Sequence, residues 1–440
     1  MTNRLTFQYL LTPAGMERDR TLELSEAGTI TAIGPAAGPA DGFLALPGMP
    51  NAHSHAFQRA LAGSAEARLG EDSFWSWREA MYRLANRVTP DDMLVIARQA
   101  FADMLRGGYT TVAEFHYLHG LPDGRCGAAM ADAVIEAAAE MGIRLTLLPV
   151  FYQAGGFDAA PQPEQRRFVH ESLDDYLGLL EDLRGKTALG VAPHSLRAVP
   201  AAQLPALTDT ARELLGADCP IHIHISEQTG EVDQCRERHG ATPVEWLAQH
   251  VALDRNWNLV HATHATAEER RLIQEHGANV VLCPLTEAYL GDGLFAAGGF
   301  DGRIAIGSDS NIRADAIEEL RWLEFGQRLA DRKRARLATS QGLGVPLWSA
   351  AAQGGAAAAG GVGGAIEIGK PADLVVLGAD SPALAGHDDA TLLDALLIGG
   401  SRADIATVYV GGRKRVERGA LAGQADPLPD FDAAVRRLLQ

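Results

Sequence analysis

The chain has 440 residues, of which 47% are hydrophobic, so it can bury a large core and is expected to hold more than one structural unit. Its 56 acidic residues outnumber its 39 basic residues and give a formal net charge of −17. This charge argues against nucleic acid or a membrane surface as a partner, because both attract basic patches. The four cysteines form no C-x-x-C pair, the N-terminal sequence has no long apolar segment and no apolar run reaches 18 residues, so we expect a cytoplasmic protein.

The first part of the chain is predicted to form short strands, over 4–11, 21–24 and 29–33, with turn residues between them. From residue 44 onward, strand patterns alternate with helix patterns. The predicted strands are 44–47, 109–115, 144–150, 189–193, 221–226, 258–261, 279–282 and 304–307, and predicted helices between them include 91–106, 127–140, 164–183 and 267–276. About eight strand-then-helix units over roughly 300 residues are typical of a (β/α)8 barrel.

The C-terminal part returns to strands. The Ala/Gly-rich stretch 350–364 is compatible with a weak helix running into a linker, and strands follow at 372–377 and 405–410 without a helix pattern between them. We therefore predict an α/β protein. It comprises residues 1–46 and 361–425 as the two parts of a small β-sandwich domain, residues 47–360 as a TIM-like barrel, and 426–440 as a C-terminal helix.

Histidines fall at the ends of the predicted strands, where barrel enzymes place their catalytic groups. His53 and His55 follow the first barrel strand, and the two-residue period of extended chain puts both on one face. Alone, this pair could be two unrelated loop histidines. In the fifth strand His222 and His224 also share a face, and we expect His224, nearer the strand end, to be the ligand and His222 to be a hydrogen-bonded core residue.

Further polar residues close other predicted strands. Glu227 lies three residues after His224, His261 ends the sixth strand with His264 three residues on, and Asp309 ends the eighth. An unpaired aspartate would be costly to bury at the end of an apolar strand, and Asp309 precedes the next helix by too many residues to be a simple N-cap. The choice between His261 and His264 as the site histidine stays open.

Taken together, these residues predict a metal site. Three imidazoles and one carboxylate suit a borderline divalent ion such as zinc, and a position left for water would make the site catalytic. The predicted ligands are His53, His55, His224 and Asp309, with Glu227 and His261 beside them.

This pattern resembles the deaminase branch of the amidohydrolase superfamily, with H-x-H after the first strand, H-x-x-E at the fifth, His at the sixth and Asp at the eighth. The binuclear branch of that superfamily uses a bridging lysine or glutamate at the end of the fourth strand. This chain has the sequence VAPH at 191–194, and Lys186 lies at the opposite end of that strand. The resemblance therefore implies a single metal ion.

Longer motifs are similar to those of the formimidoylglutamate deiminases of histidine breakdown. They are LPGMPNAHSHAFQRALAG (46–63), DSFWSWREAMYR (72–83), AEFHYLHG (113–120), APHSLRAV (192–199), HIHISEQTGEVDQC (222–235) and GSDSNIR (307–313). The resemblance implies N-formimino-L-glutamate as substrate and a homodimer as the assembly. Since the substrate carries two carboxylates, arginines are the preferred partners. The residues implied to bind substrate are Arg78 and Arg197, with Gln58, Tyr117 and His194 as further donors.

The resemblance also implies the chemistry. A metal ion makes water more acidic, His261 orients or deprotonates that water, and Glu227 carries its proton to the amidine nitrogen, so that ammonia leaves and N-formyl-L-glutamate remains. One alternative is another deaminase of this branch acting on a ring amidine such as guanine or an adenosine derivative, for which stacking rings and neutral amides would replace the two arginines. The other is a non-catalytic binding protein of the same fold, which loss of a ligand or of Glu227 would signal.

Overall fold

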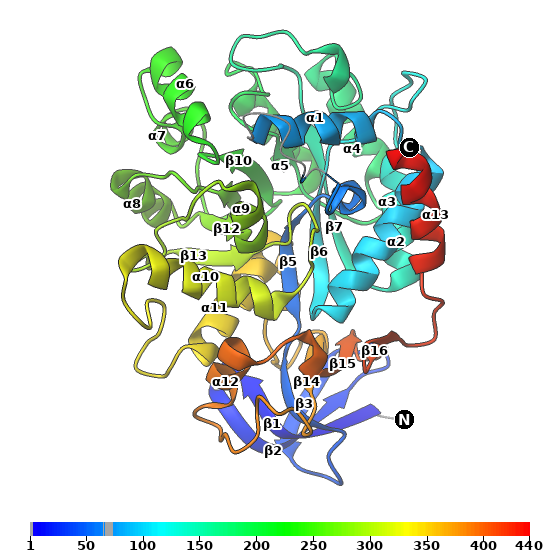
Figure 1. Ribbon diagram of the computed structural model, residues 1–440, viewed down its shortest axis with the longest axis vertical. Helices are drawn as coiled ribbons and strands as arrows, with labels where there is room; N and C mark the ends of the chain where they lie inside the picture. The colour runs from blue at the N-terminus through cyan, green and yellow to red at the C-terminus, as the bar shows by residue number, and fades with distance from the viewer. Residues whose placement is uncertain (1–2, 65, 67–73) are drawn as a thin grey trace.

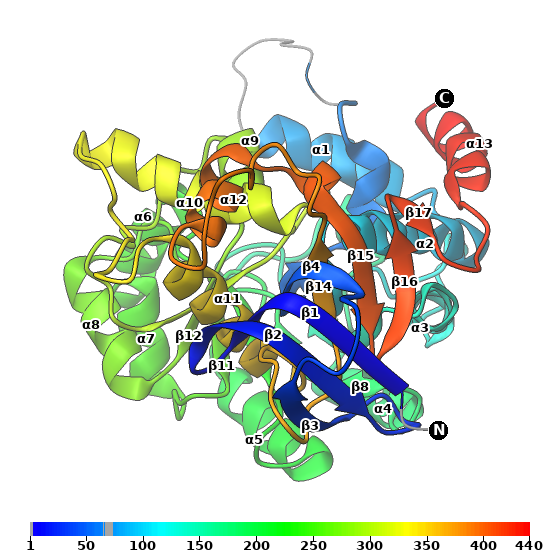
Figure 2. The same ribbon diagram turned by 90° about the horizontal axis from the view of Figure 1, so that it is seen from below.

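The computed structural model describes residues 3–64, 66 and 74–440, so Asp72 and Ser73 of the 72–83 motif lie outside the described residues. Strands from both ends of the chain pair in one eight-stranded sheet, drawn in blue and orange in Figure 2. Its strands in spatial order are β17 (Ala420–Leu421), β16 (Arg413–Glu417), β15 (Ile405–Val410), β14 (Leu374–Leu377), β4 (Gly42–Pro47), β1 (Asn3–Thr12), β2 (Gly15–Leu24) and β3 (Ile30–Pro35). Both chain ends thus build one β unit, whereas its division into the two layers of a sandwich stays a prediction.

A second group of strands is parallel and lies above the terminal sheet in Figure 1. These strands are β5 (Met49–Ser54), β6 (Tyr109–His116), β7 (Arg144–Phe151), β8 (Ala188–Leu189), β9 (Ala192–Pro193), β10 (Ile221–Ile225), β11 (Trp257–His261), β12 (Asn279–Leu282) and β13 (Arg303–Ile306). They pair in chain order within two runs, β5 to β8 and β10 to β13, and β9 pairs with β7 beyond β8. Single bridges join these runs at Val191–Ile221 and at Ser54–Asp309. The predicted α/β class is confirmed, and the pairing follows the order that a barrel requires.

Helices connect the parallel strands and also follow β14 and β17 of the terminal sheet. They are α1 (Phe74–Ala85), α2 (Pro90–Arg106), α3 (Ala129–Met141), α4 (Leu173–Leu183), α5 (Leu204–Leu215), α6 (Thr229–His239), α7 (Pro243–His250), α8 (Ala267–His276), α9 (Pro284–Leu290), α10 (Ala316–Asp331), α11 (Gly344–Ala358), α12 (Leu392–Gly399) and α13 (Leu428–Leu439), with 3-10 turns at Ala56–Leu61, Pro163–Gln165 and Arg402–Asp404. Within the described ranges, no helix is long and apolar enough to cross a membrane. The predicted C-terminal helix is α13, which packs on α2 (Figure 1).

The predicted helix 164–183 is too long, because α4 begins only at Leu173. Ser172 caps this helix by accepting the backbone N–H of Asp175. The preceding segment is instead fixed by Arg167, a fully buried side chain whose guanidinium donates to the backbone carbonyls of Ala85, Val88 and Gly120. These bonds give the buried guanidinium hydrogen-bond acceptors without a carboxylate, and they hold the segment before α4 in a non-helical conformation.

The prediction that 44–47 forms the first barrel strand is wrong. That run is β4 of the terminal sheet, paired with β1 and β14, and the first parallel strand is β5. The chain passes between the two sheets at Gly48, where a Cβ atom would lie 2.4 Å from the side chain of Thr110. As a result, His53 lies within β5 and His55 comes directly after it.

The Ala/Gly-rich stretch forms most of α11, a helix packed closely on β5 and β13. A Cβ atom on Gly354 would lie 2.0 Å from the carbonyl oxygen of Ile304, so only glycine permits this approach. The carbonyl oxygen of Ala358 at the helix end accepts a hydrogen bond of 2.8 Å from Nε2 of His222. The predicted core role of His222 is therefore confirmed.

Candidate active site

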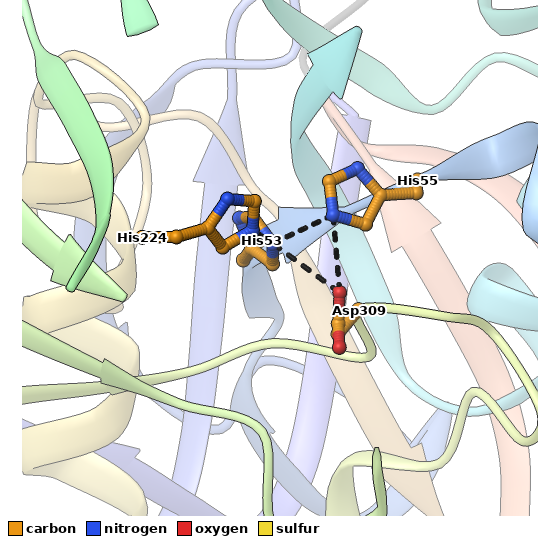
Figure 3. Close-up of side chains that lie close together, drawn as sticks. All are labelled: His53, His55, His224 and Asp309. Carbon is orange, nitrogen blue, oxygen red and sulfur yellow. Dashed lines mark hydrogen bonds and ion pairs between the residues drawn. The ribbon is translucent and has the colours of Figure 1, made fainter. Parts of the chain in front are cut away.

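The four predicted metal ligands converge at the C-terminal ends of β5, β10 and β13 (Figure 3). Nε2 of His53 lies 3.2 Å from Nε2 of His55 and 3.1 Å from Nε2 of His224. Oδ1 of Asp309 lies 3.3 Å from Nε2 of His53 and 3.2 Å from Nε2 of His55. All four side chains are buried, and their ligand atoms lie within 4.8 Å of one another.

Hydrogen bonds behind the rings fix which nitrogen faces the centre. Nδ1 of His55 donates to the carbonyl of Phe115 over 2.9 Å, and Nδ1 of His224 donates to the carbonyl of His194 over 3.1 Å. A carbonyl can only accept, so Nδ1 of each ring carries a proton and Nε2 is the nitrogen that faces the centre. Nε2 of both rings is therefore available to a cation at the centre.

The protonation states of His53, His224 and Asp309 also suit the binding of a cation. Burial lowers the pKa of His53 to about 3 and holds the pKa of His224 well below its usual value, so both rings stay neutral. Burial opposes ionisation of Asp309, but its contacts with His53 and His55 outweigh burial and keep its pKa well below the usual range. Three imidazoles and one carboxylate are a donor set that fits a divalent metal ion.

The backbone turns sharply where these side chains leave the strands. Ser226 after β10, His261 at the end of β11 and Asp309 after β13 have φ values of +52°, +69° and +45°. Residues other than glycine rarely adopt this left-handed region, and such strain gathers at functional sites. Two of these residues, His261 and Asp309, line the cavity above the ligand cluster.

His261 lies between two carboxylates beside the cluster. Its Nδ1 is 3.2 Å from Oε1 of Glu287, and its Nε2 is 4.0 Å from Oε1 of Glu227. Burial disfavours its protonation, but Glu227 and then Glu287 outweigh burial and raise the pKa of His261 to about 10. His264 is only half-buried and does not line the cavity, so the structure places His261 at the site.

Above the ligands lies a cavity with about 590 Å³ of empty space, a volume that includes its open mouth. The predicted residues Gln58, Arg78, Tyr117, His194, Arg197, Glu227, His261 and Asp309 all line it. The sequence interpretation missed the apolar and aromatic part of the wall, which is Trp77, Met81, Tyr82, Tyr152, Phe168 and Leu290. Two of these residues, Met81 and Tyr82, follow Arg78 within the 72–83 motif, so the motif itself could have indicated that they line the site.

The two arginines reach the cavity from different elements. Arg78 is on helix α1, and its guanidinium lies 5.5 Å from the ring centre of Tyr82. Arg197 follows β9, and its buried Nε has no hydrogen-bond partner among the described residues. Burial lowers the pKa of Arg78, and the positive charge of Arg197 acts in the same direction. The two arginines thus place positive charge on one part of the cavity wall in a strongly acidic protein.

Neutral polar groups complete the wall. Nε2 of Gln58 donates to the hydroxyl of Tyr117 over 2.6 Å, and Oε1 of Gln58 is buried without a partner in the part of the chain that the structure describes. Nδ1 of His194 lies 3.1 Å from Oγ of Ser195. Burial and the nearby Arg197 keep the pKa of His194 well below its usual value, so this ring is neutral. These groups offer hydrogen bonds without charge.

Comparison with known proteins agrees with this geometry. The model of the amidohydrolase family matches residues 44–415. The chain belongs to the amidohydrolase family. It is 45% identical to formimidoylglutamate deiminase of Pseudomonas aeruginosa over 98% of each chain, and 32% identical to 8-oxoguanine deaminase of the same organism over 93% of this chain and 90% of that one. The crystal structure of an amidohydrolase from Brucella melitensis superimposes with a TM-score of 0.90 at 40% identity over the full length of both chains. Membership of the amidohydrolase family and the buried ligand cluster together identify a divalent metal site.

Three further histidines form a buried cluster next to this site. The ring centres of His116 and His119 are 5.4 Å apart, and those of His119 and His170 are 4.6 Å apart. Burial lowers the pKa of His116 to about 3 and the pKa of His170 to about 4, with Asp175 opposing the shift at His170. The folded chain therefore keeps these rings neutral under conditions in which an unfolded chain would protonate them.

We expect the melting temperature of the metal-free protein to fall as the pH drops from about 6.5 toward 4. Below the usual histidine pKa the unfolded chain binds protons at these histidines, whereas the folded cluster stays neutral. Acid therefore favours the unfolded state, and the folded protein is destabilised progressively as the pH falls from about 6.5 toward 4. Thermal unfolding of wild type and of His170→Gln tests this. The variant, with one such histidine fewer, should show a flatter decline, and an unchanged slope would contradict the assignment of His170.

Proposed function

We propose that this chain hydrolyses the terminal carbon–nitrogen bond of N-formimino-L-glutamate, a reaction of histidine degradation. Water adds to the formimino carbon, the C–N bond to the terminal nitrogen breaks, and N-formyl-L-glutamate and ammonia are released. The observation that carries this proposal is one cavity that holds a metal-ligand cluster at its base and two arginines on its wall. The 45% identity to formimidoylglutamate deiminase supports the same substrate.

The proposed metal is one zinc ion, held by His53, His55, His224 and Asp309 at the mouth of the (β/α)8 barrel that the strand pairing supports. When bound, such an ion supplies a water molecule whose pKa is lowered toward about 7. A second ion would need a bridging group at the end of β9, where the chain has His194. Lys186 does not provide one, because it forms an ion pair of 2.8 Å with Asp132 near the surface.

Purified protein is expected to contain one divalent ion per chain. The four ligand atoms form one closely spaced cluster, and the described residues contain no second group of this kind. Elemental analysis of protein loaded with zinc, compared with His224→Ala, measures the stoichiometry, and the variant should lose most of its metal. A value near two per chain, or a carboxylated lysine in the site, would contradict the single-ion proposal.

The residues beside the ligands are assigned the proton transfers. Glu227 takes a proton from the attacking water and delivers it to the amidine nitrogen, which leaves as ammonia. His261 orients that water, and Glu287 holds the ring through Nδ1 so that Nε2 faces Glu227. Asp309 is assigned a catalytic role as well as a ligand role, since its carboxylate lies 3.3 Å from His53 and 3.2 Å from His55 and also lines the cavity.

The other end of the substrate meets the arginines. We assign the two carboxylates of the glutamate portion to Arg78 and Arg197, since guanidinium groups bind carboxylates in a fork geometry. Gln58, Tyr117 and His194 supply further hydrogen bonds. The arrangement would place the amidine over the ligand cluster and both anionic groups against the positive part of the wall.

A second candidate function is deamination of a ring amidine. The rings of Tyr82, Tyr152 and Phe168 line the cavity and could stack on a nucleobase, and 8-oxoguanine deaminase is a relative at 32% identity. Ammonia release from formiminoglutamate, guanine and an adenosine derivative separates the two functions. Turnover of formiminoglutamate alone is expected, and preferential turnover of a purine would replace the proposal by the second candidate.

We further propose that the protein works in the cytoplasm as a homodimer, with no nucleic acid or membrane partner. The exposed apolar side chains Trp322 and Leu329 of α10, with the nearby Leu294, provide a surface that a second copy could cover. Sedimentation of the purified protein gives the oligomeric state.

A further inference from the structure

The relative positions of three predicted ligands, His53, His55 and Asp309, depend on the contact between β5 and the segment after β13. The backbone N–H of His55 donates to the carbonyl of Asp309 over 2.8 Å, and the N–H of Asp309 donates to the carbonyl of His53 over 3.0 Å. The approach is close, because a Cβ atom on Gly307 would lie 2.8 Å from the backbone oxygen of His53. The spacing between the H-x-H segment and Asp309 is therefore set at this contact.

The side chain of Asn311 lies across this contact. Its Nδ2 lies 3.0 Å from Oγ of Ser54, 3.0 Å from the carbonyl of His55 and 3.1 Å from the carbonyl of Asp309. Its Oδ1 accepts a bond of 2.6 Å from the hydroxyl of Ser308. One amide thus joins the backbone next to two ligands on different strands.

The orientation of this amide is fixed from behind. The hydroxyl of Ser308 accepts a bond of 2.6 Å from Nδ2 of Asn51, so its own proton is left for Oδ1 of Asn311. Asn51, Ser308 and Asn311 are all essentially excluded from solvent. Asn311 also has φ +55°, a left-handed conformation that asparagine adopts more readily than most residues. The position therefore uses both the amide and the backbone preference of asparagine.

We propose that Asn311 is a positioning residue for the metal, which it affects by holding His55 and Asp309 at the separation that the ion requires. Asn311 is not itself a ligand, because its nitrogen is engaged by three oxygens and its oxygen by Ser308. Groups that orient metal ligands from behind commonly change metal affinity by about 10- to 100-fold when they are removed. This inference rests on the metal site proposed above.

The test compares Asn311→Gly with Asn279→Ala in protein stripped of metal. Glycine tolerates a positive φ, so Asn311→Gly removes the amide without adding backbone strain. Asn279 is a matched control, since it is another fully buried asparagine, whose Nδ2 donates to the carbonyl of Gly354 at the opposite end of the strands. Chelator competition should show zinc binding about 10- to 100-fold weaker in Asn311→Gly and unchanged in Asn279→Ala.

Cobalt(II) provides a second readout, because its visible absorption reports the geometry of its ligands. Asn311→Gly should shift the cobalt spectrum, whereas Asn279→Ala should lower the melting temperature and leave the spectrum as in wild type. If Asn311→Gly does not fold, Ser54→Ala, which removes one acceptor of the same amide, should weaken zinc binding and shift the spectrum to a smaller degree. Unchanged affinity and spectrum in the folded variant, or equal losses in the control, would overturn the inference. Failure of wild type to bind any divalent ion would instead overturn the proposed function.

Discussion

Glu227→Gln is expected to lower kcat by roughly 10²- to 10⁴-fold, the usual contribution of general acid–base catalysis, while the metal content stays at the wild-type value. The amide keeps the shape of the carboxylate but cannot accept and return a proton. Glu227 lines the cavity and lies 4.0 Å from His261, but it is not part of the four-residue ligand cluster. Steady-state kinetics on formiminoglutamate and metal analysis of the same preparation check both parts.

Glu231→Gln is the matched control for this prediction. Glu231 is a second buried carboxyl in the same segment, it accepts the backbone N–H of Glu227 over 3.3 Å, and it does not line the cavity. Its replacement should change kcat far less. If Glu227→Gln loses its metal while the protein stays folded, Glu227 is a ligand, and the proton transfers must be assigned to another group.

The ligand cluster could be predicted from the sequence because two local rules meet there. Alternation along extended chain places His53 and His55 together, and the convergence of parallel strand ends brings them to His224 and Asp309. Both rules depend only on short segments of sequence. The assignment of His222 to the core followed from the same reasoning, since one pleat separates it from the strand end, and its bond to Ala358 agrees.

Other features depend on contacts between distant segments and could not be predicted in this way. The run 44–47 has the apolar pattern of a barrel strand, yet it pairs with β1 and β14, because which sheet a buried strand joins is decided by partners far along the chain. Glu287 was missed for a related reason. It lies on a short helix of seven residues, α9, and nothing in that segment shows that its carboxylate meets His261. Asn311 likewise gains its role only when β13 returns to β5.

Truncation of either cavity arginine, as Arg78→Met or Arg197→Met, is expected to lower kcat/KM for formiminoglutamate. The fall should correspond to a loss of transition-state stabilisation on the order of 2–4 kcal/mol. The protein carries a net charge of −17, so its long-range field opposes an anionic substrate. Screening limits that field to about 8 Å at physiological salt, and a cation within the cavity therefore dominates once the substrate arrives. Each truncation leaves one carboxylate in the cavity without a charged partner.

The comparison substrate is formamidine, which has the reacting amidine but no carboxylate, and the comparison variant is Arg83→Met, an exposed arginine on the same helix as Arg78 that does not line the cavity. Loss of Arg78 or Arg197 should change kcat/KM for formamidine much less than for formiminoglutamate, and Arg83→Met should change neither substantially. Equal proportional losses on both substrates would mean that the arginines hold the fold rather than the substrate. In that case the positive wall of the cavity would no longer distinguish a dicarboxylate from a ring amidine, and the choice between the two candidate functions would depend on the ammonia assay alone.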